Sequence, residues 1–532
     1  MTRGGMRIAA IDVGSNSIHM VIAQVEADGR FTVLDSAKEM VRLGRHTLTT
    51  GHLSADAMDA GVRTLAAFRT LAERKGVVRF SAVATSAVRE ASNGGDFIQR
   101  VNDEVGLRVK VIPGREEARL VYLGVQHAID LRRDAAVIAD VGGGSVELIL
   151  TEEGRAAALH SVKLGVARLS ERFDVSDRPS GKELAKLEAY FREQLDPILG
   201  RFRRRKVRRV IGTSGTMLNL ISIAGYQRGE PPNGHLNNFT IGADEVARVR
   251  RLLVKADREE RLRVKGLDGK RVDLIVVGAC LADFIMRRLA AKELVACTWA
   301  LREGVLLDFL ARHRKGIEET QRFADPRRRS VARLARHLGE IGMHGEHVAH
   351  LALQLFDQLA AVLGLPAKAR EWLEFAALLH DVGHHIAHKD HQRHSYYLIT
   401  HGDLLGFQRA EVEIIGQIAG YHRKAVPKES DEPFAALSKS ERRIVRAASA
   451  LLRIADGLDR SHYGVVRDVG VTRRGHRLTL ELHTEGDDAE LETWEAGGRA
   501  GLLQELLECV IDFRIVPRSK NRHADRAASV SG

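Results

Sequence analysis

Roughly the first 310 positions alternate between short apolar runs and longer segments in which apolar residues recur at helical spacing. The stretch IAAIDVGSNSIHMVIAQV (8–25) predicts a strand, a turn and a second strand, because short apolar runs bounded by glycine and serine are typical of buried strands. An amphipathic helix is expected over 54–76, strands over 79–88 and 109–114, and a helix over 115–129. This alternation indicates an α/β domain.

The same order of elements recurs from residue 137. The stretch VIADVGGGSVELILTEEGRAAALHSV (137–162) repeats the strand, the Asp-Val-Gly-x-x-Ser turn and the second strand, so that Asp12 and Asp140 are equivalent, 128 residues apart. A helix over 180–199 and strands over 207–216 and 273–279 are expected next. The repeat predicts two similar domains whose glycine turns meet across a cleft.

The two glycine turns suit an oxyanion. Glycine lets backbone N–H groups point at a ligand with no Cβ in the way, and serine adds a hydroxyl donor. A single turn of this kind is usually a tight hairpin and nothing more. Two turns at equivalent positions, each with an aspartate, favour a cleft that grips a phosphate from both sides.

The composition indicates which class of ligand the protein binds. The chain of 532 residues carries a net charge of +12, which favours an anionic partner, and its aromatic content of 5 % leaves little material for stacking on nucleic-acid bases. No specific nucleic-acid binding is expected.

The three cysteines, Cys280, Cys297 and Cys509, are far apart and suggest neither a disulfide framework nor a thiolate metal site. The N-terminus shows no signal-peptide pattern and the apolar run 274–282 is too short to span a bilayer, so we expect a cytoplasmic protein without a transmembrane segment.

The paired turns DVGSNS and DVGGGSVE resemble the actin, sugar-kinase and heat-shock ATPase superfamily. With ATSAVREASNG (84–94), PGREEARLVYLGV (113–125) and GTSGT (212–216), the sequence is similar to the exopolyphosphatase/guanosine pentaphosphate phosphohydrolase family over roughly 6–310, and more loosely to about 515. The resemblance implies duplicated α/β domains of the ribonuclease H-like, actin-like ATPase type.

The resemblance also implies a Mg²⁺-assisted phosphoanhydride hydrolase. Asp12, Asp140 and Glu147 are the expected catalytic Mg²⁺ ligands, since carboxylate oxygens suit that ion, and Glu117 is the expected catalytic residue that positions and activates water. Without the resemblance, Glu117 would be a solvated carboxylate at a helix start, and Glu116 is the alternative assignment. The expected substrate-binding residues are Gly14, Ser15, Asn16, Ser17, Arg89, Gly142, Gly143, Gly144, Ser145, Ser214 and Gly215.

Several basic residues have two explanations. Arg89 matches a phosphate-contacting arginine of the family but could form an ordinary surface ion pair, and Arg42 and Arg45 are weaker candidates for the same contact. The run RFRRRKVRR (201–209) holds seven positive charges, which fit either a solvated helix end or a track for a long polyphosphate chain. Related kinases bind adenosine on a Gly-Gly turn, and the corresponding segment 276–285 has Ala279 in place of the second glycine, so hydrolysis is preferred over a kinase.

The character of the chain changes after about residue 320. Twelve of the 23 histidines lie between His337 and His422, several of them on amphipathic helical patterns, where a lone histidine is usually a satisfied core residue. The order His347, His380-Asp381 and Asp456 resembles the HD superfamily of metal-dependent phosphohydrolases and implies a second divalent metal, with His394 and His422 where two-metal members carry extra ligands. His384 stands where many active members have lysine. The alternative is a scaffold that extends a basic channel or supports dimerisation.

The predicted layout has four domains and a tail: 1–132 and 133–312 (actin-like), 320–467 (all-α, HD-like), 468–516 (small α/β unit) and 517–532 (disordered). The small unit is predicted to hold a hairpin over 470–484 and a helix over 497–513, which the segment RIVP (514–517) follows. We expect a homodimer.

Four functions remain open. The preferred one is an exopolyphosphatase that releases terminal orthophosphate from inorganic polyphosphate. The second converts guanosine pentaphosphate to tetraphosphate in the same cleft, as in the stringent response. The third is a nucleotide phosphohydrolase or phosphodiesterase run by the HD-like domain, and the fourth is a non-enzymatic sensor of polyphosphate or nucleotide.

Overall fold

The chain divides into two compact units, Met1–Pro326 (unit 1) and Arg327–Gly532 (unit 2). The computed structural model describes residues 6–25, 31–132, 134–173, 175, 177–232, 235–313, 325–338, 343–484 and 489–517. Residues 26–30 and the predicted tail beyond Pro517 lie outside these ranges. Within the described ranges, no helix has the length and apolar character needed to cross a membrane.

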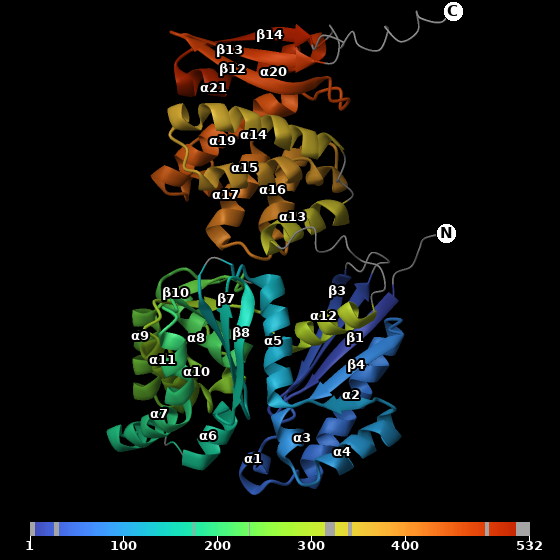
Figure 1. The fold of residues 1–532 in the computed structure, drawn as a ribbon, viewed down its shortest axis with the longest axis vertical. Coiled ribbons are helices and arrows are strands. Elements are labelled where there is room, and N and C mark those ends of the chain that lie inside the picture. Colours follow the sequence, from blue (N-terminus) through green and yellow to red (C-terminus); the bar gives the residue numbers. More distant parts are fainter. Residues whose placement is uncertain are drawn as a thin grey trace, which may run out of the picture. The chain divides into compact units, whose positions relative to one another are not determined.

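The first half of unit 1 is built on a five-stranded sheet in the order β3-β2-β1-β4-β5 (Figure 1). Its strands are β1 (Met6–Val13), β2 (Ile18–Val25), β3 (Phe31–Glu39), β4 (Arg79–Ala84) and β5 (Val109–Val111). The first three strands run antiparallel to one another, whereas β1, β4 and β5 are parallel. The helices of this half are α1 (Thr47–Thr50), α2 (Ala55–Arg74), α3 (Ser86–Glu90), α4 (Gly94–Arg100) and α5 (Gly114–Ala128), with a π-helical turn at Val101–Val105.

The second half repeats this topology in a six-stranded sheet, β10-β11-β9-β6-β7-β8. Its strands are β6 (Ala136–Val141), β7 (Val146–Glu152), β8 (Arg155–Val162), β9 (Arg209–Thr213), β10 (Thr240–Gly242) and β11 (Glu293–Ala296). From β8 to β11 the order is equivalent to the first sheet, and β10 is an added edge strand. The expected duplication of an α/β fold is therefore confirmed at the level of sheet topology.

The helices of the second half are α6 (Val166–Phe173), α7 (Gly181–Arg203), α8 (Ser214–Gln227), α9 (Ala243–Lys255), α10 (Arg258–Leu262), α11 (Ile275–Leu289) and α12 (Leu301–His313), with a 3₁₀ turn at Gly269–Arg271. The last of these, α12, returns to the first half and packs on β1, β4 and α5. Figure 1 shows α5 (cyan) between the two halves.

One sequence prediction in this unit is wrong. The apolar run 273–279, predicted as a strand, belongs to α11, which begins at Ile275 and is buried almost all round. A short continuous apolar run does not distinguish a buried strand from a buried helix, because neither has a polar face to reveal its period. The strands predicted over 79–88 and 207–216 end at Ala84 and Thr213, where α3 and α8 begin.

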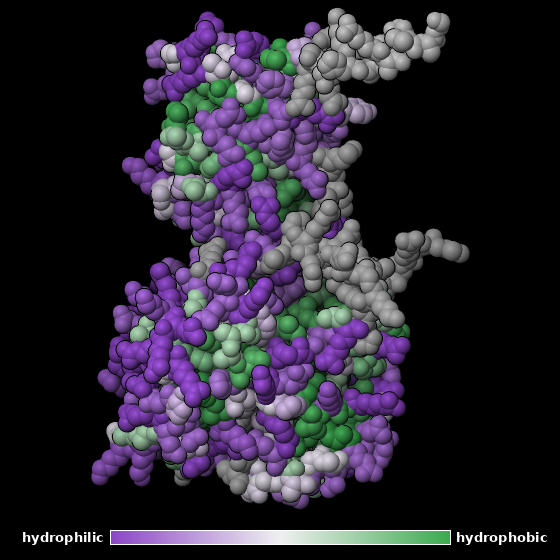
Figure 2. Space-filling model, viewed as in Figure 1, coloured by the Kyte–Doolittle hydropathy of each residue, from purple (hydrophilic) through white to green (hydrophobic). Residues whose placement is uncertain are grey.

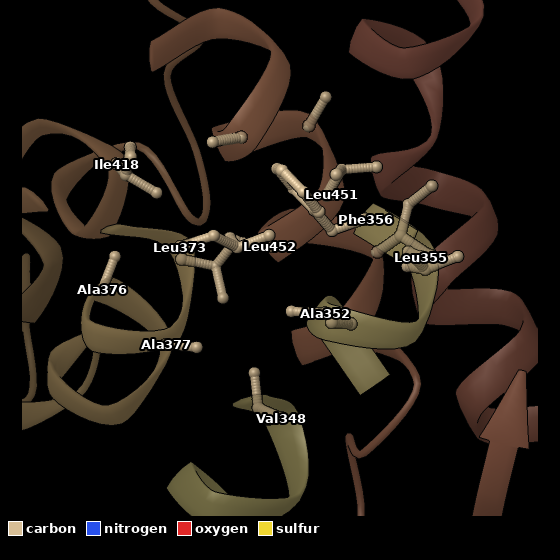
Figure 3. Packing of buried hydrophobic residues seen from close by; sticks show 14 of the residues in the cluster. Val348, Ala352, Leu355, Phe356, Leu373, Ala376, Ala377, Ile418, Leu451 and Leu452 are labelled. Carbon is tan, nitrogen blue, oxygen red and sulfur yellow. The ribbon is translucent and has the colours of Figure 1, made fainter. Parts of the chain in front are cut away.

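Unit 2 is a helical bundle that shares one core with a three-stranded sheet. Its elements are α13 (Pro326–His337), α14 (Met343–Leu363), α15 (Lys368–Leu379), a 3₁₀ turn at Val382–His385, α16 (His391–His401), α17 (Arg409–Gly420), α18 (Glu432–Ala435), α19 (Lys439–Gly457), β12 (Val466–Arg474), β13 (Arg477–Thr484), α20 (Glu490–Arg499), α21 (Gly501–Leu507) and β14 (Val510–Pro517). Figure 3 shows side chains of α14, α15, α17 and α19 meeting in this core, among them Leu355, Leu373, Ile418 and Leu451. Burying aliphatic side chains of this size contributes about 1.5–3 kcal/mol each.

The C-terminal sheet contains the hairpin expected over 470–484. The predicted helix over 497–513 is too long: helix formation ends at Leu507, and β14 starts at Val510 and pairs in parallel with β13. Glu508, with a positive φ of 50°, marks this break.

Candidate functional site

The two glycine turns have the same backbone geometry. Between β1 and β2 the amide of Gly14 donates to the carbonyl of Ser17 at 3.1 Å, and between β6 and β7 the amide of Gly142 donates to the carbonyl of Ser145 at 3.1 Å. In the flanking strands Asp12 lies opposite His19, and Asp140 lies opposite Glu147. The sequence repeat is thus a structural repeat down to single residue pairs.

The two turns also approach each other closely. A Cβ built on Gly143 would lie 3.3 Å from the Cβ of Asn16, and one built on Gly144 would lie 2.7 Å from the Oγ of Ser15. The hydroxyl of Ser15 is also 2.8 Å from that of Ser86, at the start of α3. Only glycine fits at the tip of the second turn, and the substrate-binding residues predicted in both turns lie together.

Glu117 lies at the start of α5 and is buried. Its Oε2 accepts a hydrogen bond from Nη1 of Arg89 at 2.9 Å, and the same guanidinium nitrogen donates to the carbonyl of Ile112 at 2.8 Å. Burial raises the pKa of Glu117 to about 7, although Arg89 acts against this rise. The pKa of Glu116, by contrast, is lowered by its hydrogen bond to Arg119. The two adjacent glutamates therefore have different surroundings, and only Glu117 is coupled electrostatically to the predicted metal ligands.

The predicted metal ligands Asp12 and Glu147 lie within electrostatic reach of the third, Asp140, but the oxygens of the three are not close enough together to form a metal-compatible group among the described residues. Burial raises the pKa values of Asp12, Asp140 and Glu147, and repulsion from neighbouring carboxylates adds to the rise for Asp12 and Glu147. The Oδ1 atoms of Asp12 and Asp140 are buried and make no hydrogen bond to any described residue. Glu147 accepts from the hydroxyl of Ser161 at 2.7 Å. Buried carboxylate oxygens without a donor fit a hard divalent cation such as Mg²⁺.

Beside Asp12, a chain of polar contacts fixes Ser17. Nη1 of Arg302 is 3.2 Å from Nδ1 of His19, and Nε2 of His19 is 2.7 Å from Oγ of Ser17. Since a guanidinium only donates, Nδ1 accepts and Nε2–H donates to Ser17, which leaves the hydroxyl hydrogen of Ser17 for another acceptor. Burial lowers the pKa of His19 to about 3, and Arg302 contributes to the decrease, so the ring stays neutral.

Further positive charge surrounds this side of the cleft. Burial lowers the pKa of Lys38, and the nearby Arg271 and Arg302 lower it further, so the three cations lie within electrostatic reach of one another. The sequence singled out neither Arg271 nor Arg302, nor did it single out His19. The sequence repeat could have identified His19, because His19 occupies the position in the first half that Glu147 occupies in the second.

The remaining predicted residues of unit 1 are placed as follows. Ser214 has a positive φ of 65° and its hydroxyl donates to the carbonyl of Val141 at 2.7 Å. A Cβ on Gly215 would lie 1.9 Å from the guanidinium carbon of Arg271. The absence of a side chain at Gly215 therefore leaves room for this guanidinium group. Arg42 and Arg45 are exposed, and the backbone of Arg42 donates to Asn16 at 2.8 Å.

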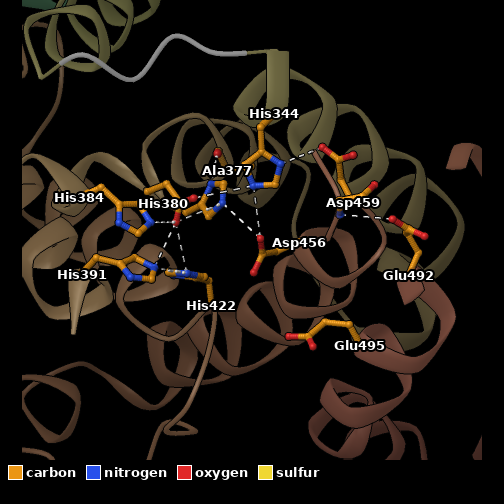
Figure 4. Close-up of polar contacts among 12 residues, drawn as sticks. His344, Ala377, His380, His384, His391, His422, Asp456, Asp459, Glu492 and Glu495 are labelled. Atoms are coloured by element: carbon orange, nitrogen blue, oxygen red, sulfur yellow. Dashed lines mark hydrogen bonds and ion pairs between the residues drawn. The ribbon is translucent and has the colours of Figure 1, made fainter. Parts of the chain in front are cut away.

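A second cluster of polar residues lies in unit 2 (Figure 4). Nε2 of His380 lies 3.6 Å from Asp381 and 3.5 Å from Asp456, so three of the four residues predicted from the HD resemblance are brought together. The fourth, His347, bonds instead to the carbonyl of Val466 at 2.7 Å. His344, one turn earlier on α14, lies 3.5 Å from Asp456 in its place.

Some of the remaining histidines lie near Asp381 and others do not. His384, His391 and His422 contact Asp381, whereas His394 does not join any group of metal-compatible side chains in the described part of unit 2. His422 was an expected extra ligand position, and His391 stands where His394 was expected.

The duplicated sheets define an actin-like ATPase fold in which two glycine turns approach each other near buried carboxylates. Residues 21–313 match the Ppx/GppA phosphatase family, and residues 327–495 match Ppx/GppA phosphatase, domain III. The chain belongs to the Ppx/GppA phosphatase family.

Similar proteins agree with this assignment. A guanosine-5'-triphosphate,3'-diphosphate pyrophosphatase from Vibrio vulnificus is 30% identical over 485 residues, which cover 90% of this chain and 92% of that protein. The solved structure of an exopolyphosphatase from Cytophaga hutchinsonii is 32% identical, with a TM-score of 0.55, covering 58% of this chain and all of that one. A Ppx/GppA family member from Aquifex aeolicus is 26% identical, with a TM-score of 0.50, covering 58% of this chain and 99% of that one.

Proposed function

We propose that this phosphatase is an exopolyphosphatase that hydrolyses the terminal phosphoanhydride bond of inorganic polyphosphate. The observation that carries the proposal is the buried Glu117, whose raised pKa and coupling to Asp140 accompany two opposed glycine turns. A carboxyl group with a pKa of about 7 is suited to accept a proton from water at neutral pH.

The residues of the cleft divide the work. The turns at Gly14–Ser17 and Gly142–Ser145 hold the terminal phosphoryl group through N–H and hydroxyl donors, and Ser17 offers it the hydrogen that His19 leaves free. Glu117 aligns a water with the terminal phosphorus and takes its proton, while the shortened polyphosphate leaves from the opposite side. Arg89 keeps Glu117 in position.

Asp12, Asp140 and Glu147 would hold Mg²⁺. That ion, when bound, offsets negative charge on the phosphoryl oxygens. The cations Lys38, Arg271 and Arg302 lie within electrostatic reach of His19 and favour a substrate that carries charge on every residue of its chain.

A second candidate is the 5'-phosphohydrolysis of guanosine pentaphosphate to tetraphosphate. It is favoured by the similarity to the Vibrio vulnificus pyrophosphatase along nearly the whole chain. Its chemistry at the phosphorus is the same, so the residues above serve either substrate.

Steady-state kinetics on both substrates tests the proposal. We expect a higher kcat/KM for long-chain polyphosphate than for guanosine pentaphosphate, and a far higher value for the guanosine compound would make the second candidate the preferred function.

A mutational test addresses the catalytic residue. Glu117→Gln should lower kcat by about 10²- to 10⁴-fold, whereas the neighbouring Glu116→Gln should leave kcat nearly unchanged. Tight binding of polyphosphate without turnover would favour the sensor instead.

The HD-type alternative has its own test. If Asp381→Ala abolishes phosphate release while Glu117→Ala leaves it intact, the reaction takes place in unit 2 and not in the cleft. The homodimer, the cytoplasmic location and the domain limits stay predictions.

A further inference from the structure

Asp381 in unit 2 lies at the centre of a group of histidines drawn from four segments of the chain. Its Oδ1 is 3.2 Å from Nε2 of His391 and 3.6 Å from the Nε2 atoms of His380, His384 and His422. Figure 4 shows these rings turned toward one another. Such convergence of ring nitrogens on a single carboxylate oxygen calls for a physical explanation.

The protonation of three of the rings follows from their outer contacts. Nδ1 of His380 is 2.7 Å from the carbonyl of Ala377, Nδ1 of His422 is 2.7 Å from that of Ala419, and Nδ1 of His391 is 3.1 Å from that of His388. A carbonyl oxygen only accepts, so each Nδ1 carries the hydrogen. In the neutral ring, Nε2 then presents a lone pair toward Asp381.

Lone pairs that face a carboxylate repel it unless a cation lies between them. Nε2 of His391 and Nε2 of His422 are only 3.2 Å apart, so at most one hydrogen fits between these two nitrogens. Nε2 of His380 is buried and makes no hydrogen bond to any described residue. Protons therefore do not satisfy the whole group, whereas metal ions accept all of these lone pairs at once.

The ligand atoms fall into two groups that share Asp381. Those of His344, His380 and Asp381 lie within 4.8 Å of one another, and so do those of Asp381, His391 and His422. Asp456 adjoins the first group, 3.5 Å from Nε2 of both His344 and His380. His384 adjoins the second group through its contact with Asp381.

We propose that unit 2 binds a pair of divalent transition-metal ions bridged by Asp381. One ion is held by His344, His380 and Asp456, and the other by His384, His391 and His422. Imidazole-rich ligand sets suit ions such as Fe²⁺, Co²⁺ or Zn²⁺, whereas Mg²⁺ prefers oxygen; Mn²⁺ is the paramagnetic probe that counts the bound ions.

The surroundings of the site hold its ligands in place. Nδ1 of His344 is 2.8 Å from Oδ2 of Asp459, whose other oxygen accepts from the backbone amide of Gly464 at 2.8 Å. Arg499 contacts Oδ2 of Asp456, which leaves Oδ1 directed at the two histidines. Carboxylate and carbonyl partners behind histidine ligands are typical of metal sites.

The proposal is independent of the phosphatase cleft, and its test measures bound metal. The purified full-length chain is stripped with a chelator, reloaded with Mn²⁺ and dialysed against excess Mg²⁺, which displaces Mn²⁺ from oxygen-only sites. We expect two Mn²⁺ per chain by elemental analysis and an exchange-coupled Mn²⁺ pair in the electron paramagnetic resonance spectrum. One ion per chain, or none, in the unmodified protein overturns the proposal.

Two variants and one control assign the ligands. The double variant His391→Ala/His422→Ala should retain one uncoupled Mn²⁺, and His344→Ala should bind fewer than two ions. His347→Ala, on the same helix as His344, should retain the coupled pair, because His347 bonds to the backbone of Val466. Loss of the pair in His347→Ala, together with its retention in His344→Ala, would refute this ligand assignment. Thermal unfolding of the metal-free variants shows whether each is folded.

Discussion

At the scale of single residues, the two halves of unit 1 repeat a backbone but not a chemistry. Asp12 and Asp140 are equivalent, yet the residue that faces each of them differs: His19 in the first half and Glu147 in the second. His19 is tied to Arg302 and Ser17, whereas Glu147 lies within electrostatic reach of Asp140. The duplication thus pairs one aspartate with a neutral imidazole and the other with a second carboxylate.

The first residue-scale prediction concerns the pH dependence of Glu117. Its pKa is raised to about 7, so the carboxylate form that accepts a proton is lost as the pH falls through that value. We expect kcat/KM to fall about tenfold for each pH unit below roughly 7. Bound Mg²⁺ would move this limb to lower pH by favouring the carboxylate.

Rate profiles between about pH 5 and 9 test this expectation. Glu116→Gln is the control and should keep the same acidic limb, since the pKa of Glu116 is lowered by Arg119. An acidic limb that persists unchanged in Glu117→Gln would show that Glu117 is not the group that produces it.

The second residue-scale prediction concerns His19 as a positioning residue. His19→Phe removes the donor to Ser17 and should lower kcat/KM about tenfold, which corresponds to the loss of one hydrogen bond near the reacting group. His19→Gln can still donate to Ser17 and should recover part of the loss, with KM changing more than kcat. Equal defects in the two variants would indicate a role in packing only.

At the scale of secondary structure, the crossing of α5 and α12 positions the site. A Cβ on Gly304 would lie 1.9 Å from the carbonyl oxygen of Leu120, and one on Gly124 would lie 2.3 Å from that of Ala300. Glu117 lies in the first turn of α5 and Arg302 lies in the first turn of α12. The two glycines allow the close approach that places both side chains at the cleft.

The element-scale prediction is that Gly304→Ala separates these helices. Overpacking of this kind costs about 1–3 kcal/mol, and a displacement of Glu117 by a fraction of an ångström should lower kcat at least about tenfold. Circular dichroism melting and kinetics measure the two effects. Gly200→Ala in α7 is the control: nothing lies within 4 Å of the new Cβ, so a gain of about 0.5–1 kcal/mol is expected. If Gly304→Ala behaves like Gly200→Ala, the crossing does not position the site.

At the scale of the whole molecule, positive charge dominates. The net charge is +12, and the face drawn in Figure 2 is largely hydrophilic. The basic run 201–209 begins in the last turn of α7 and continues beyond it; Phe202 and Val207 are buried, while Arg203, Arg204 and Lys206 are exposed. This arrangement is compatible with both explanations of the run, a solvated helix end and a polyphosphate track.

The whole-molecule prediction distinguishes these explanations. Arg203→Glu/Arg204→Glu should raise KM for long-chain polyphosphate roughly three- to tenfold at low salt, and less at high salt, if the run guides the chain. Arg251→Glu/Lys255→Glu on α9 lowers the net charge equally and serves as the control, since both residues are exposed. Equal changes in the two double variants would favour the solvated helix end.

The sequence by itself determined the duplicated α/β halves, the paired turns and the acids within them. These features are encoded in short contiguous patterns such as Asp-Val-Gly-x-x-Ser. The turn that this pattern forms has the same backbone hydrogen bond in both halves. It also indicated that Glu117, not Glu116, was the residue to test, although only through a family resemblance.

Only the tertiary structure decided which distant side chains meet. Arg302 reaches His19 because α12 returns to the first sheet, and Arg271 covers Gly215, and neither contact has a local signal. The same holds for α11, whose helical state depends on being enclosed by neighbours. In unit 2, His344 and His347 lie three residues apart on one helix, and the docking of α14 on α15 and α19 determined which of them faces Asp381 and Asp456. A helical period places both residues near the same face, so the choice rests on packing that no single segment encodes.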